Sequence, residues 1–279
     1  MKRRSILIAL SAGIGILVLF PCLVMLFISG EKMESAISRA FERKGYVFHS
    51  EGLRKSFPLR ISLTNITISD ERGPLLKIDD ASARLELLPL LSGKIVVKCR
   101  ARIGQGEGKA EYQPRTSGLD LRFAGVRLED VPLFRTTGYG DLRGVLALEG
   151  SFSGSGPANR GEVRITVKDA DFRGVRIGNL PLPDATFETV RGKYRAAGRE
   201  GTLESLAFQG EGIYLRIHGR IASSQPPASS PLDLSLDLMP KPDFMERQKM
   251  VFLALARYRT SPGVYRIPIG GTLGKPVIR

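Results

Sequence analysis

A strict alternation of polar and apolar side chains runs through Glu162-Val163-Arg164-Ile165-Thr166-Val167-Lys168. Successive side chains of a β-strand point to opposite faces of a sheet, so Val163, Ile165 and Val167 fall on one face. Their charged and hydroxyl-bearing neighbours fall on the other. The segment therefore predicts a strand with one apolar and one solvated face.

The same alternation returns twice toward the C-terminus, in residues 213–220 and 232–238. Three such segments are hard to obtain by chance. Their apolar side chains are the candidates for a sheet face or groove: Val163, Ile165, Val167, Ile213, Leu215, Ile217, Leu232, Leu234 and Leu236. On the polar phase, Arg216 and Arg220 are the candidates for contacts with a partner protein or with lipid headgroups.

Much of the remaining domain consists of short strand-like segments separated by Gly, Pro, Asn or Ser. This spacing is typical of an antiparallel meander or sandwich and not of a parallel sheet with crossover helices. At Asn65 the apolar phase of Leu63 gives way to that of Ile66, and we expect a β-bulge there. Further strands are predicted at 94–101, 107–112, 119–123, 142–148, 185–190, 202–208 and 264–269.

An internal repeat supports this organisation. Residues 123–133 and 172–182 share Phe, Gly, Val, Arg, Pro and Leu at matching positions. Self-similarity at a fixed offset marks repeated structural units. We expect two related β-units stacked along one elongated, twisted antiparallel sheet, in a mainly β domain.

Short amphipathic helices interrupt this pattern. Residues 31–45 place Met33, Ile37 and Phe41 at helical spacing, and this segment either lies at a membrane surface, extends a membrane span or packs on the domain. After Pro240, a second helix is predicted to share one apolar face among Phe244, Met245, Gln248, Phe252 and Leu255.

The run Ile6–Ile28 contains no charged side chain and follows three basic residues at positions 2–4. A helix of this length crosses roughly 30 Å of hydrocarbon, and the run exceeds the apolar region of a cleaved signal peptide. The basic flank favours a cytoplasmic N-terminus. We expect residues 1–30 to be a cytoplasmic stub and single-pass anchor, 31–45 a juxtamembrane helix, and 46–279 a β-domain outside the cytoplasm.

A lipoprotein signal at Cys22 is a weaker alternative, because Pro21 occupies the position where such a signal needs a small residue. Cys99 is the one thiol of the domain, so no disulfide can form within the domain. We expect Cys99 to be a small, buried residue. With only His49 and His218 besides, no metal-ligand spacing exists, and no cofactor or catalytic motif is found. We expect a protein that is not an enzyme.

The formal net charge of +14 raises the question of nucleic acid. The basic residues alternate along strands without interleaved aromatic residues, and the anchor would carry them out of the cytoplasm, so we expect no nucleic-acid partner. Anionic lipid headgroups or an acidic protein suit a tethered basic domain better. Ordinary solvated strand faces explain the excess equally well.

Several segments together resemble type II secretion system protein N: the leading apolar run, the strands through residues 59–68, the turn at 87–93, the Gly-rich strands and the closing residues 267–276. The chain is also similar to the wider AsmA-like group of tethered β-proteins. The resemblance covers essentially the full length but includes no diagnostic motif. It implies a single-pass inner-membrane protein with a periplasmic domain that serves export of folded proteins, without catalytic residues.

Two hypotheses follow. In the first, the domain is a scaffold that meets other secretion-system subunits and buries its apolar strand faces against a second sheet or helix. In the alternative, which the AsmA-like similarity implies, those faces line an open groove that carries phospholipid or lipopolysaccharide between membranes. The exposure of the nine apolar candidates separates the two hypotheses.

Overall fold

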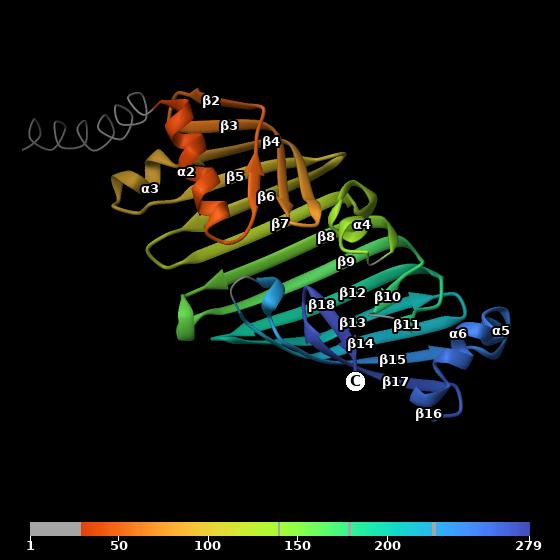
Figure 1. The fold of residues 1–279 in the computed structure, drawn as a ribbon. Coiled ribbons are helices and arrows are strands. Elements are labelled where there is room, and N and C mark those ends of the chain that lie inside the picture. The colour runs from red at the N-terminus through yellow and green to blue at the C-terminus, as the bar shows by residue number, and fades with distance from the viewer. Residues whose placement is uncertain (1–28, 139, 178–179, 225–226) are drawn as a thin grey trace, which may run out of the picture.

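The computed structural model describes residues 29–138, 140–177, 180–224 and 227–279. Sixteen strands form one antiparallel sheet that twists from β2 at one end to β16 at the other (Figure 1). A separate two-stranded hairpin is formed by β10 (Arg176–Ile177) and β11 (Leu180–Pro181). The strands of the large sheet are β1 (Val47–His49), β2 (Gly52–Ser56), β3 (Arg60–Asp70), β4 (Gly73–Leu85), β5 (Val97–Ile103), β6 (Gly106–Gln113), β7 (Gly118–Arg127), β8 (Asp141–Ser153), β9 (Arg160–Arg173), β12 (Ala185–Ala197), β13 (Glu200–Gly210), β14 (Ile213–Ala222), β15 (Leu232–Pro240), β16 (Arg259–Ser261), β17 (Val264–Thr272) and β18 (Lys275–Ile278).

The prediction of a mainly β protein with a large antiparallel sheet is confirmed. From β3 to β15 each strand of the sheet pairs with the strand of the sheet that follows it, in an antiparallel meander. Apart from the β10–β11 hairpin, the strands of the described residues make one long sheet, so a sandwich of two large sheets is not formed. The predicted segments all lie within or overlap observed strands, and most of these strands are longer than predicted.

Strand β4 was not predicted. Its apolar residues Leu76 and Ile78 pair with Ile68 and Ile66 of β3, whereas Ala81 and Ala83 occupy the other half of the strand. Small alanines and the adjacent Asp79 and Asp80 obscure the alternation that identifies other strands.

The β-bulge predicted at Asn65 is wrong. Thr64 pairs with Asp80 and Ile66 with Ile78, so the register is the same on both sides and no residue is inserted. Asn65 instead adopts a left-handed backbone with a φ of 48°, which asparagine tolerates better than most residues. Its side-chain amide donates a hydrogen bond to the Glu51 carboxylate across 2.5 Å.

The two copies of the internal repeat occupy matching places in the sheet. Phe123 lies near the end of β7 and Phe172 near the end of β9, and both strands end at the same edge. Gly125 and Gly174 follow with left-handed φ values of 70° and 61°. Gly125 lies at the register shift within β7, and Gly174 follows the end of β9. The left-handed backbone explains the shared glycine at both places, since a side chain would strain it there.

Within the described part of the chain the helices are few and short: α2 (Gly30–Glu42), α3 (Leu87–Leu91), α4 (Leu133–Thr136), α5 (Pro242–Arg247) and α6 (Lys249–Ala254), with single turns at η1 (Leu128–Asp130), η2 (Gly156–Ala158), η3 (Pro227–Ser229) and η4 (Ala256–Tyr258). Helix α2 corresponds to the predicted helix at 31–45 and packs on β1 and β2. Phe41 of α2 stacks on Phe48 of β1, with ring centroids 5.2 Å apart.

The single helix predicted after Pro240 is divided at Gln248 into α5 and α6. The Gln248 amide binds the main chain of Asp184, accepting from its N–H and donating to its carbonyl, at 3.1 and 2.7 Å. Of the five residues predicted to share an apolar face, Phe244, Phe252 and Leu255 are buried. They cover the sheet near Tyr265 of β17.

The sheet curls over one of its own faces. Register shifts interrupt the pairing of β7 with β8, of β8 with β9 and of β12 with β13, and such irregularities increase local twist and bend. Strand β18 contacts β10, and the β3–β4 turn reaches the β17–β18 turn, where Arg72 donates a hydrogen bond to the Gly274 carbonyl at 3.3 Å. Segments about 200 residues apart in sequence therefore meet across this face.

Within the described residues, no helix has both the length and the apolar character needed to cross a membrane. The predicted span Ile6–Ile28 lies outside those residues.

Candidate functional site

All nine apolar candidates lie on the same face of the sheet, as the pairing registers establish. Ile165 of β9 connects through Gly192 and Leu206 to Ile217 of β14, which pairs with Leu236 of β15. The row through Val167 reaches Leu215 across the same strands, and the row through Val163 reaches Leu234. Ile213 and Leu232 lie two residues along the strands from these rows. We call this side of the sheet the apolar face.

The apolar face continues to the opposite end of the sheet. A single row of directly paired residues crosses it without a polar side chain: Leu53, Leu63, Ala81, Ala101, Gly108, Phe123, Leu148, Ile165, Gly192, Leu206, Ile217, Leu236 and Ile267. The row passes through strands β2 to β17. A face this long and this uniform is unusual where water can reach it.

Exposure divides the apolar face into two parts. In the C-terminal part, Val167, Ile213, Leu215, Leu232 and Leu236 are buried under α5, α6, the β10–β11 hairpin and the curled end of the sheet. Val163, Ile165, Ile217 and Leu234 are only half-buried. The nine candidates therefore do not form one uniformly open groove, because the elements after β9 and β15 fold over part of them.

The N-terminal part of the apolar face remains open. Its residues on β5 to β8 are mostly half-buried: Val97, Cys99, Ala101, Ala110, Leu119, Leu121, Phe123, Leu148 and Phe152. In the described part of the chain, β5, β6 and β7 pack extensively only against neighbouring strands. Burial raises the pKa of the Cys99 thiol, as expected for a cysteine whose neighbours are apolar.

Sequence reasoning did not include these N-terminal residues among the candidates. The signal was present, since Leu119, Leu121 and Phe123 alternate with Asp120 and Arg122. This alternation predicts a strand, but the pattern of one strand does not show that its apolar residues share a face with Val163 and Ile165.

The opposite, charged face carries Arg216 and Arg220. Arg220 pairs with Asp233 at 3.1 Å, and Arg216 donates to the Glu204 carbonyl at 3.4 Å. Charged residues of neighbouring strands form many such pairs: Lys193, for example, lies 3.3 Å from Glu162 and 3.2 Å from Glu204. Mixed-sign pairs of this kind stabilise a solvated sheet face modestly.

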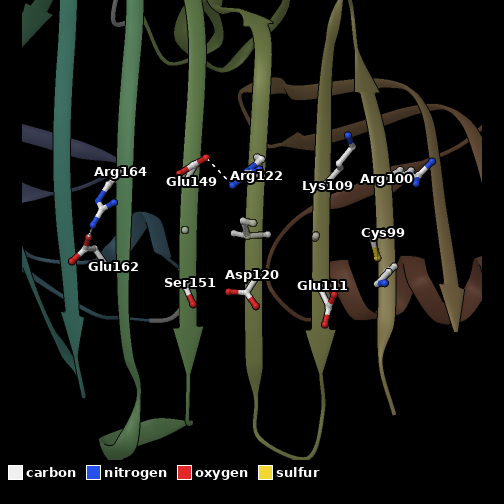
Figure 2. A pocket seen from close by; sticks show the side chains of 14 residues that line it. Cys99, Arg100, Lys109, Glu111, Asp120, Arg122, Glu149, Ser151, Glu162 and Arg164 are labelled. Atoms are coloured by element: carbon white, nitrogen blue, oxygen red, sulfur yellow. Dashed lines mark ion pairs between the residues drawn. The ribbon is translucent and has the colours of Figure 1, made fainter. Parts of the chain in front are cut away.

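Figure 2 shows a hollow in the charged face, over strands β5 to β9, with a volume of 610 Å³. It is lined by two rows of charged side chains; Arg122 and Glu149 face each other across 3.0 Å. A second hollow of 550 Å³ extends the same surface toward β3. Basic and acidic side chains are nearly balanced in the first hollow, whereas the second is lined by more basic than acidic side chains.

Among the described residues, a polar network on β14, β15 and β17 most resembles a catalytic site. Asp237 is buried, accepts a 2.7 Å hydrogen bond from Arg266 and lies 3.7 Å from Nδ1 of His218. Ser235 lies directly opposite His218, but no hydrogen bond joins them, so a nucleophile and a base are not coupled. Among the described residues no group of His, Cys, Asp and Glu could hold a metal ion.

Comparison of the chain with family models, curated proteins and solved structures finds no match.

Proposed function

We propose that this chain is a membrane-tethered, non-enzymatic protein whose open apolar face binds the acyl chains of phospholipid or lipopolysaccharide. The observation that carries the proposal is the uninterrupted apolar row from Leu53 to Ile267, of which the part on β5 to β7 has no covering layer among the described residues. Acyl chains would remove this surface from water at roughly 25 cal/mol for each Å² covered. The AsmA-like similarity points the same way.

The sequence supplies the tether in this proposal. The uncharged run before α2 would hold the domain at the inner membrane, with the N-terminus in the cytoplasm and the sheet in the periplasm. Both membranes of such an envelope are sources of acyl chains. A sheet with one apolar face would shield those chains from water while its charged face stays solvated.

The test is lipid analysis of the full-length chain purified in mild detergent. Stoichiometric phospholipid or lipopolysaccharide is expected with the unaltered chain, and Leu121→Glu should remove most of it by placing a charge on the open apolar face. Val145→Glu is the matched control, because Val145 is exposed and its strand position belongs to the charged face. Equal lipid content in both variants, or none in the unaltered chain, would contradict the proposal.

A second candidate function is a scaffold within the type II secretion system. It is favoured by the burial of Val167, Leu215 and Leu236, which a scaffold requires, and by the resemblance to protein N of that system. In this case the charged face would meet partner subunits. Replacing both Arg216 and Arg220 with Glu should weaken pull-down of secretion subunits, whereas Arg122→Glu, on β7 near the middle of the same face, should not.

A further inference from the structure

One corner of the sheet exposes large apolar side chains that no described element covers. Phe57, in the β2–β3 turn, is 88% exposed, and Leu88, in α3, is 80% exposed. Leu91 and Ile95 are also exposed and lie in the connection from β4 to β5. We call these four residues the apolar tip.

Strand pairing brings the four residues to one place. The N–H of Leu85 bonds to the Leu59 carbonyl and that of Glu86 to the Val96 carbonyl, at 3.1 and 2.9 Å. The β2–β3 turn, α3 and the start of β5 therefore leave the sheet side by side. Exposed side chains of this size in one cluster are rare on a protein surface without a function.

The corner also adjoins the point where the chain leaves the predicted membrane span. Gly30, the first residue of α2, packs beside Leu53 of β2, since a Cβ on Gly30 would lie 3.6 Å from Cδ2 of Leu53. Phe57 follows Leu53 by four residues, roughly 13 Å along a strand. Figure 1 shows α2, β2 and α3 together at this corner.

The charge around the apolar tip is positive. Arg60 and Lys94 are exposed and form no ion pair with any described residue. Arg84 and Lys98 share one acidic partner, Glu86, at 2.6 and 3.9 Å. Basic side chains that surround apolar ones are what an anionic lipid surface attracts, at about 1 kcal/mol for each Lys or Arg near the surface.

We propose that the apolar tip inserts into the anionic membrane beside the anchor, with Phe57 and Leu88 among the headgroups and acyl carbons and Arg60 and Lys94 at the phosphates. This inference rests on the anchored state of the proposed function. It fixes the orientation of the sheet, since a helix and a second contact about 13 Å away leave the domain little freedom to rotate. The open end of the apolar face then begins at the bilayer.

The chain contains no tryptophan, so one introduced residue reports on its own surroundings. Full-length Leu88→Trp and Phe57→Trp are reconstituted in vesicles of phosphatidylethanolamine and phosphatidylglycerol, with or without brominated acyl chains. Bromine should quench at least about half of the emission, because tryptophan at this depth sits within the interface. Met250→Trp is the control: Met250 is 77% exposed on α6, near the other end of the sheet, and should not be quenched.

The outcomes separate the inference from the anchor on which it depends. Protein that fails to float with the vesicles would overturn the anchor and the inference together. Protein that floats while Leu88→Trp emits equally in both vesicles would overturn docking of the tip alone. Blue-shifted emission without bromine quenching would assign the tip to a protein contact and would also refute the inference. Lys94→Glu added to Leu88→Trp should reduce the quenching.

Discussion

At the scale of single residues, one row of the apolar face contains both fully buried and half-buried side chains. Leu236 and Ile267 have no exposed surface, whereas Phe123 and Leu148 are half-buried. The first pair stabilises the fold by burial, and the second pair leaves apolar area in contact with water. A substitution in the same row should therefore have different effects on the two parts of the sheet.

Leu236→Ala should lower the free energy of unfolding by about 2–5 kcal/mol, the range for removing a fully buried leucine side chain. Chemical denaturation followed by circular dichroism measures this. Leu253→Ala is the comparison, because Leu253 is 69% exposed and should change stability by less than about 0.5 kcal/mol. Similar losses in both variants would mean that the C-terminal core is not packed as described.

At the scale of elements, the pairing of β14 with β15 depends on a glycine. Gly219 has a φ of 141°, and a Cβ there would collide with the Asp233 carbonyl oxygen of β15. The atom that the new Cβ would meet belongs to the backbone of β15 and not to a flexible side chain. The backbone of the two strands would therefore have to move.

Gly219→Ala should destabilise the sheet by about 1–3 kcal/mol and should speed amide hydrogen exchange in β15. Gly30→Ala is the matched control, because its Cβ would meet only a side-chain carbon at ordinary contact distance. Unchanged exchange in β15 would contradict the dependence of the β14–β15 pairing on a glycine at this position.

Elements also show how far the sequence could predict the fold. Period-two alternation identified β9, β14 and β15 and the face that their apolar residues share, because burial of one face dictates that pattern. The alternation does not predict β4, where alanines weaken the signal. The helical pattern after Pro240 does not predict the break at Gln248, which depends on the distant main chain of Asp184. The partial cover over Leu215 and Leu236 could not be foreseen, since it arises from tertiary contacts of α5, α6 and β10.

At the scale of the whole molecule, the contact between Arg72 and Gly274 links the two ends of the curled sheet. Arg72→Ala should leave global stability nearly unchanged but should accelerate hydrogen exchange at residues 70–73 and 273–275 together. Arg122→Ala, which removes a cation from the charged face only, should affect neither turn. Acceleration at one turn alone would argue against the link.

The same link should weaken in acid. Burial raises the pKa of Asp70, but hydrogen bonds from the main chain and side chain of Arg72 outweigh it and hold that pKa below 3.8. The contribution of Asp70 to stability is thus fully present above pH 3.8 and is lost as the pH falls through the folded-state pKa. Exchange at residues 70–73 should rise over that interval, and Asp70→Asn should remove the dependence.

The meander from β3 to β15 has one further consequence, which concerns distance. Each strand adds about 4.8 Å to the width of the sheet, so the path from β1 to β16 spans roughly 60 Å along its curve. Because every hairpin contacts mainly its neighbours, one inserted hairpin would widen the sheet by about 10 Å along its curve. The number of strands therefore sets the length of the apolar row that the sheet presents along its curve.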